Sequence, residues 1–211
     1  MGRMKPPEGS CPWSAADPLL KEYHDREWGV PQHDDRVLFE HLLMESMSCG
    51  LSWLLMLRKR RCFARNFSRF DYAQVAGYDE ATVARIMADP EMIHAERKVS
   101  AVVDNARRFL DVRREFGSFA AYVWSFTDGR TVIYPAYQKQ RLTRSALSDA
   151  FSGDLRRRGF KFVGTVSMFS FLEACGMIND HLHGCFRCGE TRALNKTVIV
   201  ADPDAPWIVG K

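Results

Sequence analysis

Apolar residues recur at intervals of three and four along most of the chain, which is the spacing of an amphipathic helix. One such segment begins after Asp34, a suitable helix N-cap, and stops at Gly50. Pro90 and Gly117 end two others in the same way. The predicted helices cover residues 34–49, 51–67, 79–89, 96–116, 118–126, 145–158 and 165–175, with a short one at 18–28. Alternation of period two is almost absent before 197–200, so the pattern predicts an all-α fold.

Three segments lack this helical pattern. Residues 1–33 are rich in proline, glycine and aromatic residues and are expected to be mostly irregular. Residues 127–142 form the longest irregular segment inside the chain, and residues 190–211 show little periodicity. We therefore expect a single helical domain over residues 1–189, followed by a loosely attached tail over residues 190–211.

Composition and charge narrow the class of protein. With 46% hydrophobic and 27% charged residues, the 211-residue chain has an ordinary globular composition. The longest charge-free apolar run, at 46–57, is too short for a membrane span, and the N-terminus lacks the apolar region of a signal peptide. We expect a cytoplasmic monomer with no membrane association. A net charge of +4 permits nucleic-acid binding without requiring it, and the basic runs at 58–61 and 156–158 are each typical of solvated helix ends.

Cysteine and histidine gather near the end of the chain in NDHLHGCFRC, residues 179–188. In a cytosolic protein such a cluster favours a metal over disulfides. His181 and Cys185 are four residues apart and supply half of a tetrahedral zinc site. The other half comes either from Cys11 and His24 in the irregular N-terminal segment or, as a local knuckle, from His183 and Cys188. Incidental polar residues are a third reading, and a catalytic zinc would in addition keep one ligand position open.

Glu45 is the only charged residue between His41 and Leu57, and it shares a helix face with Leu42. A buried carboxylate is costly unless it has a partner, so Glu45 either meets a donor or cation within the fold or faces a ligand cavity. A salt-bridged glutamate at the rim is the structural alternative. Aromatic residues able to wall a flat pocket are Trp13, Tyr23, Trp28 and Trp53, although each taken singly is more often a core residue.

The segment LRRRGFKFVGT, residues 155–165, links two predicted helices. Gly159 and Gly164 permit positive φ and a close backbone approach, and Thr165 is the expected cap of the second helix. The free N–H groups and the dipole at that helix start form an anion site, with Lys161 nearby. DNA phosphate is a natural occupant. An ordinary helix–helix turn would carry the same glycine spacing.

Four motifs together resemble 3-methyladenine DNA glycosylase I, a family of helix-hairpin-helix DNA repair enzymes. They are YHDREWGVP at 23–31, GLSW at 50–53, RRGFKFVG at 157–164 and ACGMINDH at 174–181, and their order and spacing agree from about Cys11 to Cys185. The resemblance implies a helix-hairpin-helix fold with one structural zinc that ties the two ends of the chain together. It implies the zinc ligands Cys11, His24, His181 and Cys185, which leaves His183 and Cys188 as bystanders.

The resemblance also implies a base pocket and a reaction. The base-reading, catalytic carboxylate falls on Glu45, with pocket aromatics at Tyr23 and Trp53 and also at Trp13 and Trp28. The expected reaction on double-stranded alkylated DNA flips out 3-methyladenine and hydrolyses its glycosidic bond, releasing the free base. The chain departs from the family pattern at Leu20, Ser48 and Cys49, which we expect beside the pocket, and at Gly153 within a helix.

The enzyme is expected to be monofunctional, since Lys161 lies within the hairpin and no other lysine suggests lyase chemistry. Related helix-hairpin-helix glycosylases use an aspartate beyond the hairpin, and nothing in the sequence marks Glu173 or Asp180 as that group. Two other functions compete with this one. A non-catalytic binder of damaged DNA would hold the lesion without cleaving it, and a zinc hydrolase would need an open position on the metal.

Overall fold

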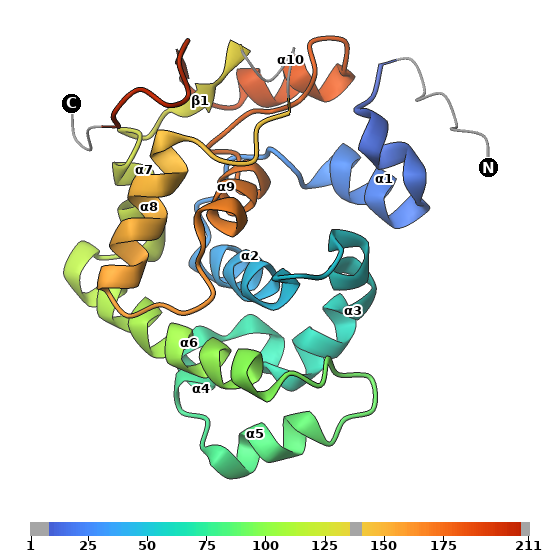
Figure 1. Ribbon diagram of the computed structural model, residues 1–211, viewed down its shortest axis with the longest axis vertical. Helices are drawn as coiled ribbons and strands as arrows, with labels where there is room; N and C mark the ends of the chain where they lie inside the picture. Colours follow the sequence, from blue (N-terminus) through green and yellow to red (C-terminus); the bar gives the residue numbers. More distant parts are fainter. Residues whose placement is uncertain (1–8, 136–140, 208–211) are drawn as a thin grey trace.

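The computed structural model describes residues 9–135 and 141–207, and within them the chain is mostly helical (Figure 1). No helix of this described part is long and apolar enough to cross a bilayer. The elements are η1 Pro12–Ala16, α1 Pro18–Arg26, α2 Asp35–Ser48, α3 Trp53–Asn66, η2 Ser68–Phe70, α4 Tyr72–Ala76, α5 Glu80–Met87, α6 Glu96–Phe116, α7 Phe119–Ser125, β1 Thr131–Ile133, α8 Ala146–Arg157, α9 Thr165–Ala174, α10 Phe186–Ala193 and β2 Thr197–Ile199. The all-α prediction is confirmed, since the two strands have three residues each.

Side-chain caps fix where the central helices begin. Asp34 accepts hydrogen bonds from the N–H groups of Arg36 and Val37 at the start of α2. The side chains of Ser52 and Ser118 cap α3 and α7 in the same manner. Each cap satisfies N–H groups that have no partner within the helix. These helix starts agree with the positions predicted from the sequence.

Helix α2 lies at the centre of the molecule and packs against α3, α6, α7 and α9 (Figure 1). Its apolar side chains are buried on several sides, and Leu38, Leu42 and Met47 are completely inaccessible. A helix that is apolar nearly all round belongs in a protein interior. Any polar side chain on α2 must therefore be buried with it, which is the position of Glu45.

Helices α8 and α9 form the hairpin predicted from the glycine spacing, and its link is held from α6. The Asn105 side chain donates to the Lys161 carbonyl at 3.0 Å and accepts from the Lys161 N–H at 2.8 Å. Two details differ from the prediction. Gly159 has φ +87°, but Gly164 has φ −63°, and the second positive φ belongs to Phe162. Gly164 is the N-cap of α9, and the Thr165 side chain donates instead to Asp149 on α8.

The N-terminal segment lies against the end of α9. Gln32 donates its N–H to the Cys175 carbonyl at 3.0 Å. At the adjoining position 176 a Cβ atom would approach the Pro31 nitrogen to 2.4 Å, and the φ there is +73°. Only glycine fits such a close backbone crossing. Gly176 therefore allows the first and last thirds of the chain to meet.

The C-terminal segment contradicts the expectation of a loosely attached tail. The boundary at residue 189 falls inside α10, and β2 pairs in parallel with β1. The Val200 N–H donates to the Ile133 carbonyl at 2.9 Å, and the Trp207 indole N–H donates to the Phe126 carbonyl at 2.8 Å. The alternation at 197–200 coincides with β2, but its partner β1 has only three residues and lies 66 positions earlier in sequence, as the Thr131–Thr197 register requires. The pattern therefore did not indicate that the two segments pair.

Candidate functional site

Two cysteines and two histidines from opposite ends of the chain meet in one buried cluster. Cys11 precedes η1, His24 lies on α1, His181 follows α9, and Cys185 is the N-cap of α10. The Cys185 Sγ lies 3.4 Å from His24 Nε2 and 3.6 Å from His181 Nδ1, and the Cys11 Sγ lies 3.7 Å from His181 Nδ1. All four ligand atoms lie within 4.8 Å of one another. The cluster can therefore hold a metal ion.

The distances fit a tetrahedral ion. With metal–sulfur and metal–nitrogen bonds of about 2.3 and 2.0 Å, sulfur and nitrogen ligands of a tetrahedral zinc lie about 3.5 Å apart. Each imidazole is also oriented by its other nitrogen. His24 Nδ1 lies 2.8 Å from Asp25 Oδ1, and His181 Nε2 lies 3.1 Å from the Trp28 carbonyl. Such second partners commonly orient metal-bound imidazoles.

The electrostatics of the cluster favour neutral imidazoles. Burial lowers the pKa of His24, although Asp25 opposes the shift, and burial lowers the pKa of His181 to about 3. Burial also raises the pKa of the Cys11 thiol to about 12. A bound cation supplies the positive charge that the thiolate form requires in such a place. The donor set is therefore suited to a metal and poorly suited to proton transfer.

The local knuckle does not form. His183 is exposed, and neither His183 nor Cys188 belongs to the four-residue cluster. Cys188 is buried on α10, where its carbonyl accepts a hydrogen bond from the Asn179 side chain. The part of the chain that the structure describes therefore favours the arrangement that joins Cys11 and His24 to His181 and Cys185.

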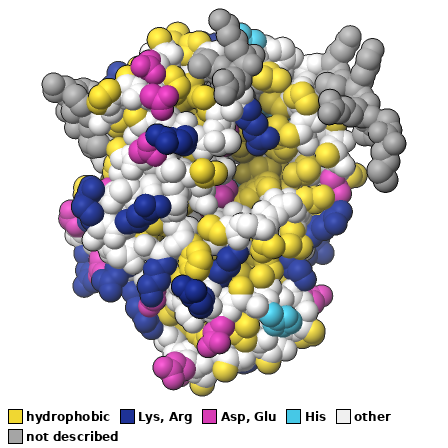
Figure 2. All heavy atoms as spheres, in the orientation of Figure 1, with side chains coloured by type: hydrophobic (Ala, Val, Ile, Leu, Met, Phe, Trp, Pro, Cys, Tyr) yellow, Lys and Arg dark blue, Asp and Glu magenta, His cyan; other side chains and the backbone are white. Residues whose placement is uncertain are grey.

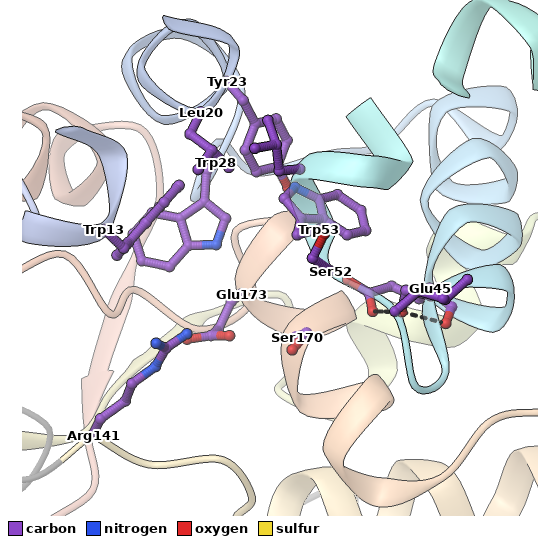
Figure 3. A pocket seen from close by; sticks show the side chains of 13 residues that line it. Trp13, Leu20, Tyr23, Trp28, Glu45, Ser52, Trp53, Arg141, Ser170 and Glu173 are labelled. Atoms are coloured by element: carbon purple, nitrogen blue, oxygen red, sulfur yellow. Dashed lines mark hydrogen bonds between the residues drawn. The ribbon is translucent and has the colours of Figure 1, made fainter. Parts of the chain in front are cut away.

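A cavity of about 370 Å³ opens beside the cluster, between α1, α3 and α9. Figure 2 shows its hollowed apolar mouth, and Figure 3 shows the side chains that converge on it. Every residue that the sequence predicts for the base pocket lines it, namely Trp13, Tyr23, Trp28, Glu45 and Trp53. Leu20 and Ser48 also line it, as expected, whereas Cys49 does not; its thiol lies 3.5 Å from Ser167 Oγ, beside the hairpin.

Glu45 is buried in the cavity wall with only 4% of its surface exposed. Its carboxyl accepts one weak hydrogen bond, from Ser48 Oγ at 3.3 Å. No ion pair reaches it from the described residues, so the salt-bridged alternative does not hold. Burial raises the pKa of Glu45 to about 8, and Ser48 opposes this only in part. A positively charged ligand would stabilise the ionised form of Glu45, for which the described residues provide no cation.

The aromatic side of the cavity is continuous with the metal cluster. The ring of Trp13 packs edge-on against Trp28 at 5.1 Å, and Tyr23 lies 5.5 Å from Trp53. Trp28 in turn contacts the His181 ring, with centroids 4.5 Å apart. The cluster that joins the two ends of the chain therefore also fixes the orientation of this wall. The Trp53 indole N–H has no acceptor among the described residues and is free for a ligand.

Sequence reasoning missed the opposite side of the cavity. Ser170 and Glu173 reach it from α9, and Arg141 reaches it from the segment before α8 (Figure 3). Leu51, Ser52 and Leu54 complete the lining near the start of α3. Glu173 carried a usable signal, because it is the only charged residue in the apolar segment 165–175, as Glu45 is in its own. Arg141 carried none, since it lies in an irregular segment.

The hairpin presents the start of α9 to solvent on the same face as the cavity mouth, and Lys and Arg side chains gather beside it over α6 (Figure 2). Several of these charges are paired. Lys161 forms an ion pair with Asp104 at 2.5 Å, and Arg158 forms one with Glu115 at 2.6 Å. Gly159 is exposed and Gly164 is half-buried, while the Thr165 hydroxyl is taken by Asp149. The N–H groups of Gly159 and Lys161 are hydrogen-bonded within the protein, so the backbone N–H groups at the start of α9 are the principal candidates for an anion.

Comparison with known proteins gives one consistent result. The family model described as methyladenine glycosylase matches residues 13–188. DNA-3-methyladenine glycosylase 1 of Escherichia coli K12 is 40% identical over 83% of this chain and 94% of its own length. DNA-3-methyladenine glycosylase of Haemophilus influenzae is 31% identical over 83% and 95%.

Solved structures give the same picture. A crystal structure of 3-methyladenine DNA glycosylase I superposes with a TM-score of 0.80 at 42% identity and covers 84% of this chain and 98% of its own. The Staphylococcus aureus protein, whose structure concerns 3-methyladenine recognition, has a TM-score of 0.79 at 34% identity and covers 88% and 97%. The residues beyond 188 lie outside the family match.

Proposed function

Because the chain belongs to the methyladenine glycosylase family, we propose that it removes 3-methyladenine from alkylated double-stranded DNA in base-excision repair. The observation that carries the proposal is Glu45, a buried carboxyl without a charged partner, in a cavity walled by Tyr23 and Trp53. A cationic, flat base supplies both the charge and the shape that such a cavity lacks. The homologues named for 3-methyladenine support the same substrate.

The reaction is hydrolysis of an N-glycosidic bond. Methylation at N3 makes the adenine cationic and weakens its bond to C1′ of the deoxyribose. When this bond breaks, the electron pair stays with the base, which leaves uncharged as free 3-methyladenine. The oxygen of a water molecule forms the new bond to C1′ and releases a proton. With no lyase lysine proposed, the DNA product is an abasic site.

Glu45 is proposed to recognise the base by accepting hydrogen bonds from its edge and by favouring its positive charge. Tyr23 and Trp53 would stack on or flank the flipped purine, with Trp13 and Trp28 completing the aromatic wall. Because the alkylated base is already a good leaving group, recognition and positioning contribute more than strong acid–base catalysis.

The Cys11, His24, His181 and Cys185 cluster is proposed to bind one zinc ion per chain. Bound there, zinc supplies structural cross-linking of the two ends of the chain. Four protein ligands leave no position for water or substrate, which argues against the zinc hydrolase. Within this cluster, His181 holds Trp28 in place, and Cys11 holds the nearby Trp13.

DNA phosphate is proposed to bind at the hairpin, on the backbone around Gly159, Lys161, Gly164 and Thr165 at the start of α9. Phosphate contacts position the duplex without reading its sequence, so the cavity would carry the specificity. The protein is proposed to act as a monomer, since the cavity and the cluster are both complete within one chain.

Mass spectrometry of the bases released from methylated DNA tests the proposal. The expected result is release of free 3-methyladenine by the parent protein, lost in Glu45→Gln. Binding to methylated DNA with no release of base would instead identify a non-catalytic damage binder. A chelator that removes the metal should lower the melting temperature of the protein without acting as a competitive inhibitor.

A further inference from the structure

Glu173 gives the cavity a second buried carboxyl, on the wall opposite Glu45 (Figure 3). It lies near the end of α9, is 7% exposed and lines the cavity directly. Ser170 lies one helical turn earlier on the same wall. Two carboxyls from two helices therefore face one aromatic space large enough for a purine.

The surroundings of Glu173 do not account for it as an ordinary salt bridge. Its buried neighbour is the carboxyl of Asp180, which accepts no hydrogen bond from an N–H or hydroxyl group of the described residues. Arg141 is the only cation that lines the described cavity, and it is exposed at the mouth. A single solvated guanidinium does not neutralise Glu173, Asp180 and Glu45 together.

The electrostatic state of this wall points the same way. Burial, and then the neighbouring Asp180, raise the pKa of Glu173 well above its ordinary value, and Arg141 opposes the shift. The negative charge of Glu45 also contributes to the increase. The two walls thus interact across the cavity. A cation placed between them would favour the ionised form of both carboxyls.

We propose that Glu173 is a second base-contacting carboxyl and that the two walls together make the cavity selective for cationic purines over uncharged ones of the same shape. This inference rests on the proposed function, because it assumes that an extruded base occupies the cavity. It adds a specificity-determining residue on α9. Asp180 neighbours Glu173 on the side of the protein interior, and neither of its carboxyl oxygens has a hydrogen-bond partner among the described residues.

The substitution that tests the role is Glu173→Gln. Glutamine keeps the length of the side chain, and its amide N–H groups can donate to the Asp180 carboxylate, so the fold has no new unpaired group. Only the negative charge is lost. Glu96→Gln, in the first turn of α6 and away from the cavity, is the matched control.

Two methylated adenines separate charge recognition from shape. 3,9-Dimethyladeninium is a permanent cation, whereas 9-methyladenine is uncharged and nearly the same shape. Tryptophan fluorescence reports binding of either probe, since Trp13, Trp28 and Trp53 line the cavity. We expect Glu173→Gln to weaken binding of the cation about ten- to a hundredfold, as for a lost charged hydrogen bond, and binding of 9-methyladenine by less than about threefold.

A purely structural role gives a different result. It would lower the melting temperature or the zinc content, and it would weaken the binding of both probes by the same factor. The ratio of the two dissociation constants distinguishes the two roles even if part of the variant is misfolded, because unfolded molecules bind neither probe. Adding Ser170→Asp to Glu173→Gln returns a carboxylate to the same wall, and partial recovery of cation binding is expected.

An unchanged ratio in Glu173→Gln, with the parent protein preferring the cation, would overturn the inference and leave the proposed function intact. A parent protein that shows no preference for the cation and releases no 3-methyladenine would overturn the proposed function first. Excision from methylated DNA should follow the cation affinity, falling in Glu173→Gln and remaining parental in Glu96→Gln.

Discussion

The two walls of the cavity are held in different ways. The wall of Trp13, Tyr23 and Trp28 belongs to the N-terminal segment and is tied down by the Cys/His cluster through Trp28 and His181. The wall of Glu173 and Arg141 belongs to α9 and to the segment before α8, next to the C-terminal strand pair. One wall supplies flat apolar surface beside the Cys/His cluster, and the other supplies charge beside the strand pair. Shape and charge are therefore held by separate parts of the structure.

The largest effect is expected from breaking the tie of the aromatic wall. Cys11→Ala removes one of the four proposed metal ligands, and metal binding free energy is folding free energy. We expect loss of zinc and a decrease of at least about 3 kcal/mol in the free energy of unfolding, measured by elemental analysis and urea denaturation. Cys188→Ala is the control and should keep the metal and nearly all of the stability. The reverse pattern would establish the local knuckle instead.

A second test removes the charge nearest to the aromatic wall. Glu45→Gln keeps the shape of the side chain and much of its hydrogen bonding, but loses the charge that favours a cationic base. We expect excision from methylated DNA to fall by about 2–4 kcal/mol in transition-state stabilisation, on the order of a hundredfold in rate. The melting temperature should be at least that of the parent. Parental excision by the folded variant would place the base pocket elsewhere.

Glu45→Gln should also remove a pH dependence of the protein's stability. The pKa of Glu45 is raised from 4.5 to about 8 in the folded protein. Between these values the unfolded chain releases a proton that the folded protein retains, so this carboxyl lowers stability as the pH rises. The loss is at most about 1.4 kcal/mol per pH unit and ends near pH 8. Denaturation at several pH values should show Glu45→Gln gaining on the parent from pH 5 to pH 8, and a constant difference would contradict the shift.

Loosening the C-terminal segment, which lies away from the Cys/His cluster, should have a moderate effect. Trp207→Ala removes a partly buried ring and its hydrogen bond to the Phe126 carbonyl. We expect a loss of about 1–2 kcal/mol in stability with no loss of zinc. Elemental analysis beside thermal denaturation distinguishes this result from that of Cys11→Ala. Loss of the metal in Trp207→Ala would mean that the two walls are not held independently.

The smallest effect is expected where both walls are left intact. Gly164→Val places a branched side chain at the start of α9, where a Cβ atom would lie 3.6 Å from the Arg156 guanidinium. We expect weaker binding to damaged and undamaged duplex alike, by about 1 kcal/mol, because phosphate contacts carry no sequence information. The affinity of both duplexes should also fall steeply with salt. Unchanged affinity for both, with the fold intact, would remove the hairpin from the DNA-binding surface.

Parts of the cavity were predictable from local sequence signals, whereas the roles of its aromatic residues followed from the family resemblance. Asp34 marks the start of α2, and Glu45 stands out as a lone carboxyl in an apolar segment. The choice of Cys11 and His24 over the local knuckle came from family resemblance, since spacing alone left both possible. The structure places these residues with His181 and Cys185 as that resemblance implied.

The charged wall was not predictable in the same way. Arg141 reaches the cavity only because of how the segment before α8 runs in space, and no periodic pattern records that path. The β1–β2 pair depends on hydrogen bonds between residues 131–133 and 197–199, which are far apart in sequence. Glu173 was considered only as a catalytic acid and set aside, although its segment is as apolar as that of Glu45. In this protein, a lone carboxyl in an apolar helix indicates a residue of the cavity wall in both cases.

Cys11 and His181 are in contact although they are 170 positions apart in sequence. This separation determines when the cluster can form during synthesis of the chain. A ribosome must deliver almost the whole chain before the cluster can close, whereas α2, α3 and α6 can pair while translation continues. Closing so long a loop early is slow, and a body folded beforehand shortens the search. Capture of the ion is then expected to be the last step of maturation. Scarcity of the metal would leave an otherwise folded protein whose base pocket is unfinished.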